Sequence, residues 1–286
     1  MKSYLSVFIL CLISAATAVW AAVPETENAK NRISLSARQG MLSQLIARDV
    51  CFVMAGIQPE RYADSALSAV RQFDTTLAGL LDGNDNLRIN MEQDPAIRSV
   101  LSDIETSWFV LRPASQQIAS GDLHTVPMGQ MLLYGQLILD QSATLAARQV
   151  TEYGPQVHPD LATTLRAANR LATYAIKASN EYCLIALDID RAGRSAALQQ
   201  TIAAMDDLVI SMTRGAPDIG VMRPPDRQME KQLNRIATVW EQLSAILRTS
   251  GETTKTDADQ VKLANLSNQI LLEVKTVVNM YLYLAL

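Results

Sequence analysis

Apolar residues recur at helical spacing along most of the chain that follows residue 31. The clearest stretch runs from Arg32 to Ile57, and its pattern predicts one long helix. A single stripe of this helix begins polar and ends apolar, in the order Arg32, Ser36, Gln39, Ser43, Ile46, Val50, Met54 and Ile57. We therefore expect the apolar end to pack in a dry core, and the polar end to face water, a partner or a small polar ligand.

Proline, glycine and capping residues divide the remaining pattern into further helices. Asp94-Pro95 is typical of a helix start, because Asp caps free backbone N–H groups and proline suits the first helical position. Breaks of this kind occur at Gly56, Pro59, Gly83, Gly121, Gly154-Pro155, Pro159, Asp190, Gly215, Pro224-Pro225-Asp226 and Gly251. They predict four helices up to Tyr153 and four more from Pro159 to Leu286.

Rare residues recur at one fixed spacing. Trp108 and Trp240 are 132 residues apart, and so are Cys51 and Cys183. The same spacing pairs other residues, including Asp74 with Asp206, Gly83 with Gly215, and Asp94 with Asp226. Such self-similarity predicts a tandem duplication, with units at residues 32–154 and 159–286. Long helices joined by short loops then predict an all-α fold of two tandem antiparallel four-helix bundles.

The two paired cysteines each follow an apolar helical run, where a cysteine is most simply a small buried hydrophobe. An exported protein can form disulfides. However, we expect equivalent core positions of two separate bundles to be too far apart for Cys51 and Cys183 to bridge. Trp108 and Trp240 are expected to fill the two cores.

The first residues of the chain are typical of a secretory signal peptide, which we place at residues 1–21. Lys2 precedes an apolar run from Tyr4 to Ile13, and small residues follow at a cleavage site. The run is too short to cross a bilayer, and we find no later run long enough to do so. These features predict secretion to the periplasm and a mature chain without a membrane span.

The net charge and the absence of catalytic motifs argue against several classes of function. Lys and Arg total 25 against 29 Asp and Glu, and removal of Lys2 with the leader gives a mature net charge of about −5. This balance argues against nucleic acid and anionic membranes as partners. We find no metal-ligand spacing, no phosphate loop and no nucleophile motif, and His124 and His158 stand at predicted helix starts. We expect no enzyme activity, no cofactor and no metal.

The polar stripe is the best candidate for a binding site. The guanidinium groups of Arg32 and Arg38 are suited to a planar oxyanion. The hydroxyls of Ser36 and Ser43 and the amide of Gln39 would supply further donors. The alternative is a solvated helix start without a ligand.

The residues Arg32-Ile33-x-Leu35-x-x-Arg38-Gln39-x-Met41-Leu42-Ser43-Gln44 resemble the opening helix of the NarX-like or PilJ-like sensor domain. That domain forms the N-terminal region of type IV pili methyl-accepting chemotaxis transducers and of nitrate/nitrite sensor kinases. The resemblance implies a periplasmic four-helix bundle that senses a ligand. In the nitrate sensors, an arginine of this motif holds the anion between the first helices of two subunits.

The chain departs from that motif at two arginine positions, where it has Gly40 and Leu45. The arginine expected to hold nitrate or nitrite is therefore missing from the first unit. In the second unit, Asn169 to Tyr174 can be aligned with the motif so that Arg170 takes the place of Gly40. That alignment uses an offset of 130, whereas the other pairs share 132.

Two functions fit these features. In the first, an exported sensor-like protein binds a small anion through Arg32, Ser36, Arg38, Gln39, Ser43 or Arg170, and presents it to a membrane receptor. It has no signalling domain of its own. In the second, the polar stripe docks a receptor helix or a second copy of the chain, and there is no small ligand. Exposure of the apolar run from Val277 to Leu286 would favour the second function.

Overall fold

The computed structural model describes residues 23–249 and 257–284. These ranges form eight α-helices and three short 3-10 helices, and they contain isolated β-bridges but no β-strand. The α-helices are α1 (Glu25–Met54), α2 (Pro59–Asp82), α3 (Pro95–Ala119), α4 (Thr125–Tyr153), α5 (Pro159–Ala186), α6 (Arg191–Arg214), α7 (Arg227–Arg248) and α8 (Asp257–Leu282). The predicted all-α class is confirmed. The predicted leader, Gly251 and Leu286 lie outside the described residues.

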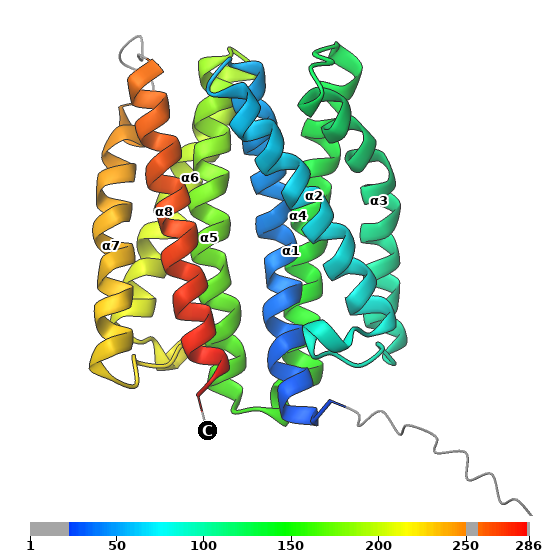
Figure 1. Cartoon of the computed structure of the whole chain (residues 1–286). Helices are drawn as coiled ribbons and strands as arrows, with labels where there is room; N and C mark the ends of the chain where they lie inside the picture. Colours follow the sequence, from blue (N-terminus) through cyan, green and yellow to red (C-terminus); the bar gives the residue numbers. More distant parts are fainter. Residues whose placement is uncertain (1–22, 250–256, 285–286) are drawn as a thin grey trace, which may run out of the picture.

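The helices form two antiparallel four-helix bundles that stand side by side (Figure 1). Helices α1 to α4 pack around one core, and α5 to α8 pack around the other. Helices α1 and α5 lie in the centre, rise from the same end of the molecule and make the main contact between the bundles (Figure 1). Apolar side chains of both bundles join in one continuous core cluster.

The helix boundaries follow from the predicted capping residues. The side chain of Asp94 accepts a hydrogen bond from the backbone N of Ile97 at 2.7 Å, with Pro95 in the first turn of α3. Asp226 does the same for α7, accepting from the backbone N of Met229 at 2.8 Å. Each cap satisfies N–H groups that lack a partner within the helix.

The start of the first helix differs from the prediction. We expected the first helix to begin at Arg32, but α1 already begins at Glu25. The added turns are held by the loop before α3. The side chain of Asn28 accepts from the backbone N of Asn90 at 2.8 Å, and Arg88 pairs with Glu27 at 2.7 Å. These contacts are distant in sequence, so local periodicity does not reveal them.

The two bundles repeat the same local geometry 132 residues apart. The turns after α2 and α6 contain the bridges Asn84–Ile89 and Ala216–Val221. Both turns begin at a glycine with positive φ, +84° at Gly83 and +77° at Gly215, which favours glycine.

The two tryptophans also make the same polar contact. The indole N–H of Trp108 donates to Asp74 at 2.7 Å, and that of Trp240 donates to Asp206 at 2.7 Å. Both rings are buried, as expected for core residues.

The two cysteines are the main correction to the expected fold. Cys51 and Cys183 form a disulfide, with their Cα atoms 6.2 Å apart, although we expected them to be too distant. The expectation treated the bundles as separate bodies. In the structure, α1 and α5 are parallel neighbours, so each cysteine faces its own counterpart. When two equivalent residues contact each other, their units are related by an approximate two-fold axis at that contact. Here the axis passes between α1 and α5.

Candidate functional site

The polar stripe of α1 points into the first bundle and not toward solvent. Arg32, Ser36, Gln39 and Ser43 each have 0% of their surface exposed. The prediction that this end faces water is therefore wrong. The apolar continuation was predicted correctly, because Ile46, Val50 and Ile57 are buried in the core and Met54 is half-buried against it.

The Arg32 side chain forms an ion pair and hydrogen bonds with other residues of the first bundle. Its guanidinium forms an ion pair with Glu92 at 2.7 Å and donates to the backbone oxygens of Leu80 and Asn90. Glu92 also accepts from the Gln149 amide at 3.2 Å and from the Tyr153 hydroxyl at 2.7 Å. A buried ion pair requires such additional hydrogen bonds. With these partners, Arg32 holds the loop before α3 against α1, while its Nε is buried without a protein partner among the described residues.

The other members of the stripe are also enclosed. The Ser43 hydroxyl donates to the backbone oxygen of Gly40 at 2.9 Å. The Ser36 hydroxyl and both polar atoms of the Gln39 amide are buried without a protein hydrogen-bond partner among the described residues. None of these three residues lines either of the two cavities described below, which lie on other faces of α1.

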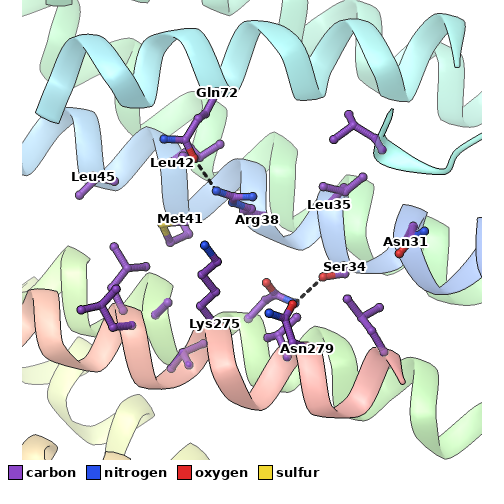
Figure 2. A pocket seen from close by; sticks show the side chains of 18 residues that line it. Asn31, Ser34, Leu35, Arg38, Met41, Leu42, Leu45, Gln72, Lys275 and Asn279 are labelled. Carbon is purple, nitrogen blue, oxygen red and sulfur yellow. Dashed lines mark hydrogen bonds between the residues drawn. The ribbon is translucent and has the colours of Figure 1, made fainter. Parts of the chain in front are cut away.

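Arg38 lies on a different face of α1, where the two bundles leave a cavity of about 380 Å³. We call it the Arg38 cavity. Its walls come from α1, α2, α5 and α8, and from Leu87 of the turn after α2. Its polar lining consists of Asn31, Ser34, Arg38, Gln72, Asn169, Lys275 and Asn279, and most of the remaining lining is aliphatic. In Figure 2, Lys275 extends from α8 toward α1, where Arg38 lies.

The charges of this cavity are positive and unbalanced. Among the described residues that line it, none is Asp or Glu. The Arg38 guanidinium donates to the side-chain oxygen of Gln72, which is neutral. Burial lowers the pKa of Arg38, because a charged group loses its hydration there. Two cations that face one cavity without a carboxylate would be stabilised by a bound anion.

Arg170 lies in another cavity, on the opposite side of the α1–α5 pair. We expected to align Arg170 with Gly40 through an offset of 130. The helices instead recur at 132, so Arg170 takes the place of Arg38. Gly40 itself faces α4, where an added Cβ would come within 3.3 Å of Leu139. The structure therefore does not bring Arg38 and Arg170 together.

Sequence reasoning missed several residues of the Arg38 cavity. Gln72, Asn169, Lys275 and Asn279 come from helices far from Arg38 in the sequence. No local motif marks Lys275. The 132-residue spacing could have pointed to Asn169. It makes Asn169 the counterpart of Ala37, and places it on α5, the helix that packs against α1.

Other chemistry is sparse in the described residues. His124 and His158 are the residues that precede α4 and α5, and His124 lies 3.7 Å from Asp122 at the surface. In residues 23–249 and 257–284, no three His, Cys, Asp or Glu side chains are placed to hold a metal ion. None of the described helices combines the length and the apolar character needed to cross a membrane.

Comparison with known proteins supports a sensor-like domain. Residues 22–134 match the N-terminal domain of type IV pili methyl-accepting chemotaxis transducers, PilJ. The match includes α1, α2, α3 and the first part of α4, and therefore Arg38 and Gln72 of the cavity. The chain has no significant match among curated proteins.

Proposed function

We propose that this chain is an exported, periplasmic sensor-like protein that binds a small monocarboxylate with an apolar tail in the Arg38 cavity. It presents this ligand to a membrane receptor and catalyses no reaction. The similarity of residues 22–134 to a chemotaxis transducer domain supports the sensory role.

The observation that carries this proposal is the lining of the Arg38 cavity. Arg38 and Lys275 supply two cationic donors, and five neutral polar side chains surround them. Leu, Met, Val and Ala side chains form the rest of the lining. A volume of about 380 Å³ falls in the range of small-molecule pockets. Nitrate or nitrite would leave most of this space and its apolar walls unused, so a larger organic anion fits better.

Two observations support the other parts of the proposal. The Cys51–Cys183 disulfide suits an oxidising compartment such as the periplasm, to which the predicted leader would direct the chain. The 132-residue recurrence of turns, caps and Trp–Asp contacts supports a duplicated sensor unit. In this interpretation, α1 and α5 stand where two subunits of a NarX-like sensor would meet.

The test is titration calorimetry of the mature protein with hexanoate, benzoate and nitrate. We expect one molecule of hexanoate or benzoate to bind and nitrate to give little heat. Arg38→Ala should weaken hexanoate binding at least about tenfold, since a hydrogen bond to a charged group contributes about 1.5–3 kcal/mol. Lys275→Ala should act in the same direction.

Arg71→Ala is the matched control, because Arg71 is exposed on α2 next to Gln72 and does not line the cavity. This variant removes the same charge and should bind hexanoate normally. The proposal fails if no carboxylate binds, or if Arg71→Ala weakens binding as much as Arg38→Ala. In either case the docking of a receptor helix or of a second copy becomes the better explanation.

That alternative currently has little support from the C-terminal apolar run. Val277, Val278 and Tyr281 of this run are buried in the second bundle, whereas Tyr283 is 88% exposed. The buried members therefore serve the core and do not form a contact surface.

A further inference from the structure

The cavity that contains Arg170 corresponds to the Arg38 cavity through the approximate two-fold axis. We call it the Arg170 cavity; it has a volume of about 420 Å³ and lies between α1, α4 and α5. Its α4 wall includes Leu139, Asp140, Ser142, Ala143 and Ala146, together with Gln136. The first five have counterparts in the Arg38 cavity. The α8 wall of the Arg38 cavity includes Leu271, Leu272, Val274, Lys275 and Val278. Each of these is the residue 132 positions later, so the fold builds the same recess twice.

The two recesses differ in chemistry at equivalent positions. Ser34 and Leu45 of the first cavity are replaced by Arg166 and Lys177 in the second. On α8, by contrast, Lys275 corresponds to Ala143. The second cavity therefore carries its cations on one face of α5, at Arg166, Arg170 and Lys177, and has fewer aliphatic side chains.

Of these three cations, Arg166 and Arg170 lack an ionic partner in the described part of the chain, and Lys177 has one. Lys177 pairs with Glu181 and also donates to Thr201. Arg170 contacts the Tyr174 hydroxyl and ring, which are neutral. Within the described ranges, neither Arg166 nor Arg170 has a carboxylate at ion-pair distance. Burial, and to a lesser degree the charge of Arg170, lowers the pKa of Arg166.

The opposite wall contributes polar groups. Asp140 lines this wall and accepts a hydrogen bond from the Gln136 amide at 3.0 Å. Its single negative charge stands against the three cations of α5 that line the same cavity. Ser142 is only 2% exposed, and its buried hydroxyl has no protein partner among the described residues. An unpartnered buried hydroxyl in the wall of a cationic recess offers a hydrogen-bonding group that a polar ligand or an ordered water can use.

We infer that the Arg170 cavity is a second, separate anion site, which binds a small dicarboxylate through Arg166 and Arg170. The two arginines are four residues apart on α5, or about 6 Å along the helix axis. This spacing offers one planar guanidinium to each of two carboxylates, and a guanidinium pairs with a carboxylate through two parallel hydrogen bonds. A bound dianion also removes the repulsion between like charges at this helical spacing.

The experiment titrates the mature protein with succinate and with inorganic phosphate, and repeats each titration in the presence of saturating hexanoate. We expect succinate to bind with hexanoate present, and phosphate to bind at least about tenfold more weakly. Arg166→Ala and Arg170→Ala should each weaken succinate binding about tenfold or more. Arg170→Lys should give an intermediate loss, because lysine keeps the charge without the planar donors.

Two controls separate this site from the Arg38 cavity. Arg148→Ala removes an exposed arginine from α4 that does not line the cavity, and should leave succinate binding unchanged. Arg38→Ala should also bind succinate normally, even if the proposed monocarboxylate function fails. The inference is overturned if succinate does not bind, or if phosphate binds equally well. It is also overturned if Arg38→Ala abolishes succinate binding while Arg170→Ala retains it.

Discussion

The cores of the two bundles use opposite chemistry at equivalent positions. On α1 the stripe facing the first core carries Arg32, Ser36, Gln39 and Ser43, all fully buried. On α5 the residues 132 positions later are Thr164, Ala168, Leu171 and Ala175, which are also fully buried. One backbone arrangement therefore accommodates a polar interior in the first bundle and a largely apolar interior in the second.

The difference depends on where each bundle finds partners for polar atoms. Arg32 pairs with Glu92 from the loop before α3, and Gln149 and Tyr153 from α4 donate hydrogen bonds to Glu92. The counterpart of Glu92 is Pro224, which cannot accept through a side chain. Thr164 instead uses a single hydroxyl, which donates to the backbone oxygen of Asp160 and accepts from the backbone N of Met222. The same helix packing can therefore enclose either polar or apolar side chains. A buried polar side chain requires that the neighbouring loop and helix also supply its hydrogen-bond partners.

The largest expected effect concerns the link between the bundles. Replacing both Cys51 and Cys183 by Ala removes a crosslink across 132 residues. A chain-entropy treatment gives about 5 kcal/mol for a loop of this length. We expect the urea midpoint of the double variant to fall accordingly, and hydrogen exchange to increase along both α1 and α5.

Reductant supplies the control for this variant. Dithiothreitol should lower the stability of the wild-type protein toward that of the double variant, and should not change the variant itself. An equal effect of dithiothreitol on both proteins, or a double variant as stable as the oxidised wild type, would contradict the prediction.

The next effect should be confined to the polar core. Glu92→Ala leaves Arg32 as a buried charge without a carboxylate, which costs about 3–5 kcal/mol. Urea unfolding measures the loss, and hydrogen exchange should place it in α1 to α4. Replacing both partners, as in Arg32→Met with Glu92→Leu, should restore part of the stability because no unpaired charge remains, although Gln149 and Tyr153 lose their acceptor.

The apolar bundle offers the matching substitution. Thr164→Val removes the acceptor for the backbone N of Met222 and should cost only about 1–2 kcal/mol. Similar losses from Glu92→Ala and Thr164→Val would mean that the buried ion pair contributes no more to the free energy of unfolding than one neutral hydrogen bond. The two cores would then differ in composition but not in the energy of their polar contacts.

The helices could be predicted from sequence because their signals are local. Asp94, Asp226, Gly83 and Gly215 act at the turns where they were expected to act, through hydrogen bonds or backbone angles within a few residues. The all-α class follows from the apolar period and these breaks. The start of α1 was misjudged because its stabilising contacts come from Arg88 and Asn90, in a loop far along the chain.

The candidate site could be predicted only in part, because it depends on how the bundles meet. Arg38 was selected for its chemistry, and it does line a cavity, but Lys275 joins it from α8 through packing that no sequence spacing encodes. Arg32 was selected on the same grounds and is instead neutralised by Glu92. The disulfide was rejected because the repeat was treated as two separate bodies, whereas an approximate two-fold axis brings Cys51 and Cys183 together.

The smallest effect tests what the two bundles share. Trp108→Phe and Trp240→Phe each remove one indole N–H bond to an aspartate, both 2.7 Å long. Each should cost about 1–2 kcal/mol, since the acceptor is a charged group that remains partly exposed to water. The ring neighbours differ, because Phe73 stacks on Trp108 with centroids 4.0 Å apart and its counterpart is Met205. Phenylalanine can still stack on Phe73, so the two losses should be similar in thermal unfolding. The double variant should lose the sum of the two within about 0.5 kcal/mol, as for independent sites. A markedly larger loss at Trp108 would show that the first bundle differs from the second in its aromatic packing as well as in its buried charges.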